Sequence, residues 1–539
     1  MAAESVSLPA LHREGHYSDR VVTCFAERHE TVDDMMRAVT AEHAGRDAII
    51  DGTHRLTFAD LDQKVTALAA GYRDLGLDPG DRLGLLIGNR WEFVAALLAA
   101  IRAGLIAVPM STRGRAPELS YMLNDCSAAG LVYEAELADR LPDATNVPDL
   151  KVRMSIGDHP DAANSLDRII ARGLTTLPAP QAREEDTAVI LYTSGTTGNP
   201  KGAMLTHLNI VHSCLHFRHG FALGPEDRSG LAVPASHVTG LIACIMAPLS
   251  VGGAVLVLTA FDVHDFLALA ATERMTTTVM VPAMYNLCLL RAELRDYDLS
   301  AWRVGSYGGA PMPPATIKAL ADQLPGLNLA NAYGATETTS PTTLMPLGDP
   351  EAHTDSVGKA VLCGEIRVMD DAGREVAPGE TGEVWIAGPM VVSGYWNKPE
   401  ATQASFIGGF WRSGDIGSLS ADGYLRVFDR KKDMINRGGY KVFSAEVENA
   451  LAAHPAVVEA AVLPMADPVL GEKVLAIIHA EGSADADALR GFCAERLSDY
   501  KLPDRFIFRD DPLPRNANGK LMKAVLRESL SELTASKPA

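Results

Sequence analysis

The stretch Asp186–Asn209, DTAVILYTSGTTGNPKGAMLTHLN, carries the strongest signal in the chain. Its apolar run Ala188–Tyr192 predicts a buried strand, which leads into a segment dense in Gly, Ser and Thr, followed by a stretch of helical character. Glycines let the backbone turn its N–H groups toward an anion, hydroxyls add donors, and Lys201 adds a positive charge. The Gly-Lys-Ser/Thr ending of a Walker A loop is missing. We therefore predict a different phosphate-binding loop, formed by Thr193, Ser194, Gly195, Thr196, Thr197, Gly198 and Lys201.

Six further segments along the chain resemble, in order, the motifs of one enzyme superfamily. They are Pro234–Gly240 (PASHVTG), Ser306–Pro313 (SYGGAPMP), Asn331–Thr338 (NAYGATET), Trp411–Gly417 (WRSGDIG), Asp429–Val442 (DRKKDMINRGGYKV) and Pro514–Lys520 (PRNANGK). Together with the loop they span nearly the whole chain. This ordered set resembles the adenylate-forming superfamily, which comprises acyl-CoA synthetases, adenylation domains and firefly-type luciferases.

The resemblance implies a specific chemistry. A carboxylate attacks the α-phosphorus of ATP and pyrophosphate leaves, so two anions must meet and electrostatic stabilisation is the main requirement. The resemblance assigns catalytic roles to His237, Thr336, Glu337 and Lys520, with Glu337 as a ligand of Mg²⁺. Beyond the loop, it assigns contacts with ATP and coenzyme A to Gly308, Gly309, Ala310, Asn331, Tyr333, Gly334, Asp415, Arg430, Gly438 and Gly439.

The fold class follows from alternating β-branched and Ala/Leu-rich stretches, which indicate α/β layering. The region 362–425 is Gly-rich with short strands and predicts a β-barrel-like subdomain. We predict a large N-terminal domain of layered α/β sheets with that subdomain (residues 1–430) and a small mobile α+β C-terminal domain (residues 431–539), with a hinge near Lys432. Ser444 stands where many relatives have Pro, and we expect it to serve as a helix N-cap. Asn436 stands where many relatives have Lys.

The resemblance also indicates the acid pocket. Its predicted members carry little positive charge, and Ser236–Thr239 lacks the Asp that amino-acid-activating relatives usually place there. This favours a hydrophobic monocarboxylic acid, whether fatty, alicyclic or aromatic. His237 is interpreted as an aromatic gate, with a satisfied core histidine as the alternative. The predicted pocket residues are His237, Val238, Thr239, Gly240, Tyr307, Gly309 and Thr338.

Three functions remain open at this level. The first is an acyl-CoA synthetase, in which the thiol of coenzyme A displaces AMP. The second is a free-standing enzyme that loads a carrier protein, and the third is a non-catalytic nucleotide-binding protein. A homodimer is one further hypothesis, and a lysine acetyltransferase acting on Lys520 is another, since loss of the charge would abolish adenylation.

Composition limits the partners and the compartment. The 539 residues carry a net charge of −19, which argues against nucleic acid. The seven cysteines are scattered and the first residues are charged, so we expect reduced thiols, no signal peptide and a cytoplasmic enzyme. The uncharged stretch Leu241–Leu258 is interrupted by Pro248 and Gly252, which predicts a buried helix and strand and no membrane span. The grouped histidines do not favour a metal site; they are His207, His212, His216 and His219.

Overall fold

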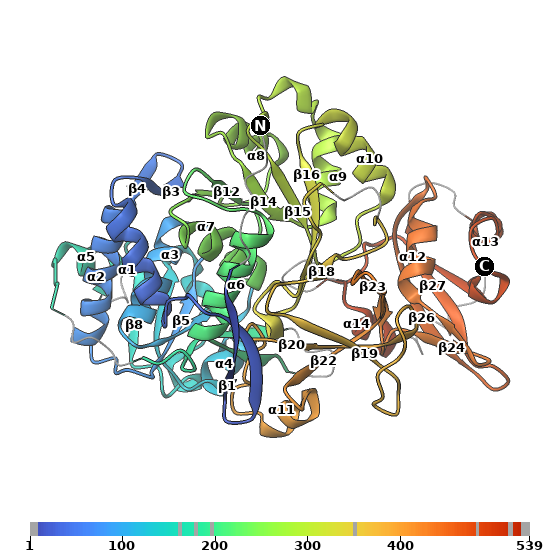
Figure 1. Cartoon of the computed structure of the whole chain (residues 1–539), viewed down its shortest axis with the longest axis horizontal. Helices are drawn as coiled ribbons and strands as arrows, with labels where there is room; N and C mark the ends of the chain where they lie inside the picture. The colour runs from blue at the N-terminus through green and yellow to red at the C-terminus, as the bar shows by residue number, and fades with distance from the viewer. Residues whose placement is uncertain are drawn as a thin grey trace. The chain divides into compact units, whose positions relative to one another are not determined.

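The computed structural model describes residues 9–159, 164–176, 182–193, 199–348, 353–480, 485–515 and 521–529 (Figure 1). The chain divides into two compact units. Unit 1 comprises the chain up to residue 193 together with Asn199–Ile366 and Ile386–Trp411, and unit 2 comprises Arg367–Trp385 and the chain from Arg412 onward. The predicted α/β class with a small C-terminal α+β part is confirmed. The predicted boundary at residue 430 stays a prediction.

The first sheet of unit 1 has seven strands in the order β11-β10-β6-β5-β7-β8-β9. Its strands β5 and β6 are short apolar runs buried on both faces, which is typical of a covered parallel sheet. Helix α3 (Trp91–Arg102) is buried at every residue because it contacts β5 and β6 on one side and β3 of the second sheet on the other. The strands are β5 (Arg82–Leu86), β6 (Ile106–Pro109), β7 (Ala128–Glu134), β8 (Val152–Ile156), β9 (Asn164–Ser165), β10 (Thr187–Thr193) and β11 (Lys201–Thr206), and the other helices are α1 (Val32–His43), α2 (Phe58–Asp74), α4 (Ala116–Asp125) and α5 (Leu166–Ala171).

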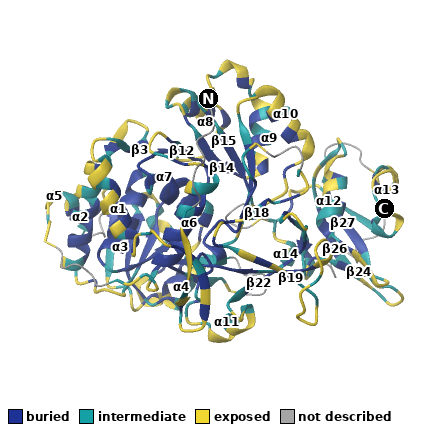
Figure 2. Ribbon diagram, viewed as in Figure 1, coloured by how far each residue is buried: buried dark blue, intermediate teal, exposed yellow. Residues whose placement is uncertain are grey.

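The second sheet has nine strands in the order β18-β17-β16-β15-β14-β12-β13-β3-β4, with a parallel centre and antiparallel edges. Figure 2 shows its central strands buried and exposed residues on the outer helices. Phe266, Tyr285 and Trp302 pack their rings together in the core on one face. The strands are β3 (Asp47–Asp51), β4 (His54–Thr57), β12 (Arg228–Leu231), β13 (Ala254–Val257), β14 (Thr277–Met280), β15 (Val304–Tyr307), β16 (Asn328–Tyr333), β17 (Thr343–Leu344) and β18 (Lys359–Ala360), and the helices are α8 (Val263–Thr272), α9 (Pro282–Arg291) and α10 (Pro314–Gln323).

The segment around the predicted phosphate loop differs from the expectation in one respect. The strand at Ala188–Tyr192 is confirmed as part of β10, but the loop does not lead directly into a helix. Strand β11 intervenes and pairs antiparallel with β10, so the loop joins two strands of a hairpin. Helix α6 (His207–Gly220) begins only after β11, where Thr206 and Asn209 form a capping box. The helical character of the sequence belongs to α6 alone.

The uncharged stretch Leu241–Leu258 forms the predicted buried helix and strand. It contains the wide helix η3 (Thr239–Met246), the short helix α7 (Ala247–Leu249) and strand β13, and these are almost wholly buried. Among the described residues, no helix is long and apolar enough to cross a membrane. The predicted reduced thiols agree with the structure, in which all seven cysteines are free and buried.

Unit 2 is built on a five-stranded sheet in the order β25-β24-β27-β26, with β28 parallel to β27. Helices α12 and α13 cover the apolar side chains of one face, and α14 covers those of the other. A second five-stranded sheet, β19-β20-β22-β21 with β23 beside β22, occupies the Gly-rich region. The elements of the Gly-rich region are β19 (Glu365–Met369), β20 (Thr381–Ala387), α11 (Pro399–Ser405), β21 (Phe406–Ile407), β22 (Phe410–Leu419) and β23 (Leu425–Arg430), of which α11 and β21 lie in unit 1. The elements that follow are β24 (Ile435–Arg437), β25 (Tyr440–Val442), α12 (Ser444–Ala452), β26 (Val457–Asp467), β27 (Gly471–Ala480), α13 (Ala486–Ala494), β28 (Arg505–Arg509) and α14 (Lys523–Glu528).

Ser444 does not act as the N-cap that the sequence suggested. Phe443 occupies the cap position, and Ser444 is the first residue of α12. Its backbone N–H and its hydroxyl both donate to Oδ2 of Asp429, the hydroxyl at 2.7 Å. The ammonium of Lys523 in turn donates to the Ser444 hydroxyl at 2.7 Å and pairs with Glu448 at 2.7 Å. A proline at this position has neither donor, so this buried network depends on the serine.

Replacing Ser444 with alanine should lower the free energy of unfolding by about 1–3 kcal/mol, because it removes two hydrogen bonds to charged groups, one to the Asp429 carboxylate and one from the Lys523 ammonium. Urea unfolding followed by circular dichroism measures the change. Ser529→Ala removes an exposed hydroxyl that donates to the Val525 carbonyl, and should change stability by less than about 0.5 kcal/mol. Equal effects of the two variants would show that the network does not stabilise unit 2.

Candidate active site

The flanks of the predicted phosphate loop lie side by side. Thr193 and Lys201 are register partners at the ends of β10 and β11, and the Thr193 hydroxyl donates to the Lys201 carbonyl at 3.4 Å. The Lys201 ammonium lies 5.0 Å from the centre of the Tyr395 ring. The other predicted members of the loop lie outside the described residues; they are Ser194, Gly195, Thr196, Thr197 and Gly198.

Two more predicted segments meet at one edge of the nine-stranded sheet. Strands β14, β15 and β16 are parallel, so their carboxyl ends share an edge, which is where ligands bind to open α/β sheets. Tyr307 ends β15 opposite Asn331 of β16; burial raises the pKa of the Tyr307 phenol, and a hydrogen bond to Asn331 opposes this. A β-carbon at Gly308 would lie 2.4 Å from the Ala332 carbonyl oxygen, so only glycine fits there. The structure thus brings together the predicted residues Tyr307, Gly308, Gly309, Ala310, Asn331, Tyr333 and Gly334.

The segment with His237 follows β12, a parallel neighbour of β14 in the same sheet. Nδ1 of His237 accepts the Thr239 N–H at 3.4 Å, and the side chain is partly exposed, so His237 is not buried in the core. A β-carbon at Gly240 would lie 2.2 Å from the Pro234 carbonyl oxygen, which requires glycine at the start of η3. Wide helical turns of this kind are frequent at functional sites. Val238 and Thr338 are buried.

Glu337 lies in the short helix η5 (Thr336–Thr338) directly after this sheet edge. The Thr338 hydroxyl accepts the Ala335 N–H at 2.9 Å, which holds the turn. Oε1 of Glu337 accepts a hydrogen bond from the Tyr395 hydroxyl at 2.8 Å. Among the described residues, Oε2 makes no hydrogen bond or ion pair. A carboxylate with one free oxygen fits a hard cation such as Mg²⁺.

Sequence reasoning missed Tyr395. The residue stands 58 positions after Glu337, in Gly394-Tyr395-Trp396, and no local pattern links it to a nucleotide. Burial raises the pKa of its phenol, and the charge of Glu337 raises it further, so the hydroxyl stays a donor at neutral pH. The one sequence feature that could have pointed to a functional role for Tyr395 is its place beside Gly394 in a Gly-rich segment, and this indication is weak.

In unit 2, Asp415 and Arg430 are register partners on β22 and β23. Arg430 Nε lies 2.7 Å from Asp415 Oδ1, and the Asp415 side chain is buried. The predicted ribose acceptor thus already forms an ion pair in this structure.

Gly438 and Gly439 form the two-residue turn between β24 and β25, with φ of 59° and 91°. Positive φ at both positions is typical of a tight hairpin turn and favours glycine. Lys432 lies in the turn that follows β23, and Lys520 lies outside the described residues.

His207 and His212 of α6 form hydrogen bonds with backbone groups. His207 Nδ1 accepts the Val32 N–H at 3.2 Å, and His212 Nε2 accepts the Phe25 N–H at 3.3 Å while Nδ1 donates to the Leu208 carbonyl at 2.9 Å. Burial lowers the pKa of His207 to about 4 and that of His212 to about 3, so both rings are neutral at neutral pH. These bonds use ring nitrogens that a metal would need.

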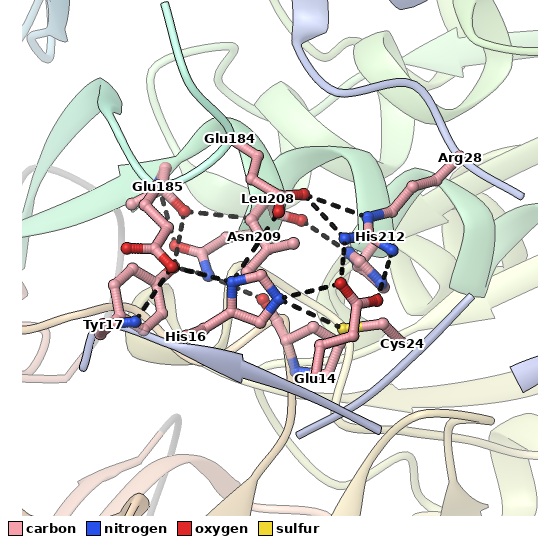
Figure 3. Close-up of polar contacts among 12 residues, drawn as sticks. Glu14, His16, Tyr17, Cys24, Arg28, Glu184, Glu185, Leu208, Asn209 and His212 are labelled. Atoms are coloured by element: carbon pink, nitrogen blue, oxygen red, sulfur yellow. Dashed lines mark hydrogen bonds and ion pairs between the residues drawn. The ribbon is translucent and has the colours of Figure 1, made fainter. Parts of the chain in front are cut away.

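A different group, Glu14, His16 and Cys24, lies close together on the hairpin β1 (Leu11–His16) and β2 (Arg20–Phe25) (Figure 3). Both oxygens of Glu14 accept from the Arg28 guanidinium, at 2.6 and 2.8 Å, and this lowers the pKa of Glu14 to about 2. Burial raises the pKa of the Cys24 thiol, which therefore stays protonated. A cation would have to displace Arg28, so the group is explained as an ion-pair network that holds the hairpin.

The comparisons with known proteins agree with this geometry. The family of AMP-binding enzymes matches residues 36–396, and the C-terminal domain of AMP-binding enzymes matches residues 446–520. A feruloyl-CoA synthase from Amycolatopsis is 35% identical over 91% of this chain and 97% of its own length. A long-chain-fatty-acid–CoA ligase of Mycobacterium tuberculosis is 34% identical over 88% and 93%, respectively. The structure of an anthranilate CoA ligase with anthranoyl-AMP has a TM-score of 0.87 and 26% identity, covering 94% of this chain and 99% of the other.

The chain belongs to the AMP-binding, adenylate-forming enzyme family. Within that family it is an enzyme of the AMP-forming acid–CoA ligase type, as predicted. The acid it activates is a separate question.

Proposed function

We propose that this enzyme activates a hydrophobic monocarboxylic acid with ATP, through an acyl-adenylate and pyrophosphate, and then forms the thioester with coenzyme A. The observation that carries the proposal is the gathering of Gly308, Asn331, Tyr333 and Glu337 at one sheet edge, with Lys201 and Glu337 both in contact with Tyr395. A cation, a carboxylate and a glycine turn are the groups that binding of a nucleotide and its metal ion requires, and this supports the proposal.

Roles follow from the chemistry of each group. Lys201 would bind the β- and γ-phosphates, Thr336 would donate to the α-phosphate, and Tyr333 would contact the adenine. Glu337 would hold Mg²⁺, which neutralises phosphate charge when bound. The ribose contacts of Asp415 and Arg430, the pantetheine contacts of Gly438 and Gly439, and the catalytic contacts of Lys520 remain predictions.

The choice of acid rests on the pocket segments. Val238 and Tyr307 are buried and apolar in character, and Ser236–Thr239 contains no carboxylate that could hold a substrate ammonium. The relatives named above include ligases for ferulate and long-chain fatty acids, and an indoleacetate–CoA ligase of Aromatoleum aromaticum is 32% identical over 91% of this chain; all three substrates are hydrophobic monocarboxylic acids. This supports a fatty, alicyclic or aromatic acid for the present enzyme.

Pyrophosphate release across a panel of acids tests the proposal. The panel comprises ferulate, indoleacetate, cyclohexanecarboxylate, palmitate, malonate and phenylalanine, each with and without coenzyme A. We expect release with at least one of the first four acids, and a thioester only with coenzyme A. Capture of the acyl group by a phosphopantetheinyl carrier protein without coenzyme A would show the carrier-loading alternative. No release with any acid would support a non-catalytic protein.

Replacing Lys432 with proline should separate the two half-reactions. The resemblance implies that the small domain turns near Lys432 between them, and proline would fix φ at residue 432 near −65° and restrict residue 431. We expect thioester formation to slow about tenfold while acyl-adenylate formation stays within about threefold of the wild type. Single-turnover measurements of each step provide the test, with Lys432→Ala as the control that keeps backbone freedom. Equal losses in both steps would contradict a hinge at this position.

A further inference from the structure

Tyr395 links the two charged groups of the proposed phosphate site in unit 1. Its hydroxyl donates to Glu337 Oε1 at 2.8 Å, and its ring lies 5.0 Å from the Lys201 ammonium. The ring also packs edge-on against Phe406, with centroids 5.8 Å apart, and only 6% of the residue is exposed. A single side chain therefore contacts both a predicted metal ligand and a predicted phosphate-binding cation.

The backbone around Tyr395 is fixed to the strand that begins at Lys201. The Trp396 N–H donates to the Gly202 carbonyl at 2.8 Å, and the Met204 N–H donates to the Gly394 carbonyl at 3.1 Å. The Val392 N–H donates to the Glu337 carbonyl at 3.0 Å. Lys201, Glu337 and Tyr395 are thus tied together through the backbone as well as through their side chains.

The N-terminal hairpin holds the same segment from another side. The guanidinium of Arg20 donates to the carbonyls of Val391, Val392 and Ser393, at 3.2, 2.8 and 3.1 Å. Arg20 is buried, and it also contacts the Phe406 ring at 5.5 Å. Three carbonyls on one buried cation leave the segment little freedom, so the Tyr395 hydroxyl is presented to Glu337 in one place.

We infer that Tyr395 is a positioning residue, which binds Oε1 of Glu337 so that Oε2 is held ready for the metal ion of the nucleotide. A hydrogen bond to one carboxylate oxygen restricts rotation of the side chain and removes the entropy cost of ordering it upon metal binding. This inference rests on the proposed function, because it assumes that Glu337 binds a divalent cation with ATP.

The decisive variant is Tyr395→Phe, which keeps the ring beside Lys201 and Phe406 and removes only the hydroxyl. We expect the affinity for Mn²⁺ in the presence of ATP, measured by electron paramagnetic resonance as a substitute for Mg²⁺, to fall about tenfold, which is typical for loss of a group that orients a metal ligand. The KM for the acid should change less than about twofold, because the contact is on the phosphate side.

The matched control is Tyr192→Phe, which removes a phenol that donates to another carboxylate, Asp125, at 2.9 Å. This control should lower stability to a similar degree and leave Mn²⁺ affinity unchanged. A wild-type affinity for Mn²⁺ in Tyr395→Phe, or an equal loss in Tyr192→Phe, would overturn the inference while leaving the proposed function intact. Absence of Mn²⁺–ATP binding in the wild type would overturn both.

Discussion

Replacing Lys520 with alanine should lower the rate of acyl-adenylate formation by about two to three orders of magnitude, the cost typical of removing one group that stabilises charge in a transition state. Lys520 itself lies outside the described residues, but both flanks of its segment are described. Arg515 and Leu521 pair as an antiparallel bridge, and the Arg515 guanidinium donates to Glu459 at 3.1 Å. The ends of the segment are therefore held at the edge of the core of unit 2.

The effect is measured as single-turnover formation of acyl-AMP with an acid found active in the panel. Lys473→Ala is the matched control, because its partly exposed ammonium pairs with Asp467 at 2.6 Å and ion pairs near the surface contribute little. Thioester formation from supplied acyl-AMP should survive in the Lys520 variant. Full adenylation activity in Lys520→Ala, or in Lys520→Gln, would contradict both the catalytic role and the hypothesis that acetylation regulates this residue.

Replacing Glu337 with glutamine should lower acyl-adenylate formation on the order of 100-fold or more, because it removes the negative charge that a divalent cation requires. The amide oxygen can still accept the hydrogen bond of Tyr395, so the packing at this position is retained. The loss should therefore reflect charge and not a change of fold.

Two measurements distinguish loss of the negative charge from a change of fold. Mn²⁺ affinity in the presence of ATP should fall at least as far as in Tyr395→Phe, whereas the thermal midpoint should stay close to that of the wild type. Glu400→Gln makes the same charge change at an exposed position of α11 and should leave both values unchanged. Normal Mn²⁺ affinity in Glu337→Gln would rule out Glu337 as the metal ligand.

The motif segments could be recognised in the sequence because each is a continuous stretch. Gly240 is required by a close backbone approach within its own segment, and Gly438 and Gly439 by the turn that they form. Gly308 is required by the Ala332 carbonyl of the neighbouring strand, a reason that only the tertiary structure shows. Periodicity likewise predicted the strand at Ala188–Tyr192 and the buried stretch after Leu241, since both depend on neighbours in the chain. The sequence did not predict strand β11 at Lys201–Thr206, and the reason is that its neighbours lie outside the segment itself. A short strand between a loop and a helix is defined by its pairing with β10, which local composition does not encode.

The sequence by itself determined the family, the α/β class and the order of the motifs, because these depend on residue types at local spacings. The preference for a hydrophobic acid stays a prediction. Only the tertiary structure showed that Tyr395 binds Glu337, that Ser444 joins Asp429 to Lys523, and that Asp415 pairs with Arg430. It also showed that Arg20 holds carbonyls some 372 positions away. The physical reason is that a hydrogen bond depends on distance in space. Two residues far apart in the chain leave no joint pattern in one sequence, and only the packed sheets bring them within 3 Å.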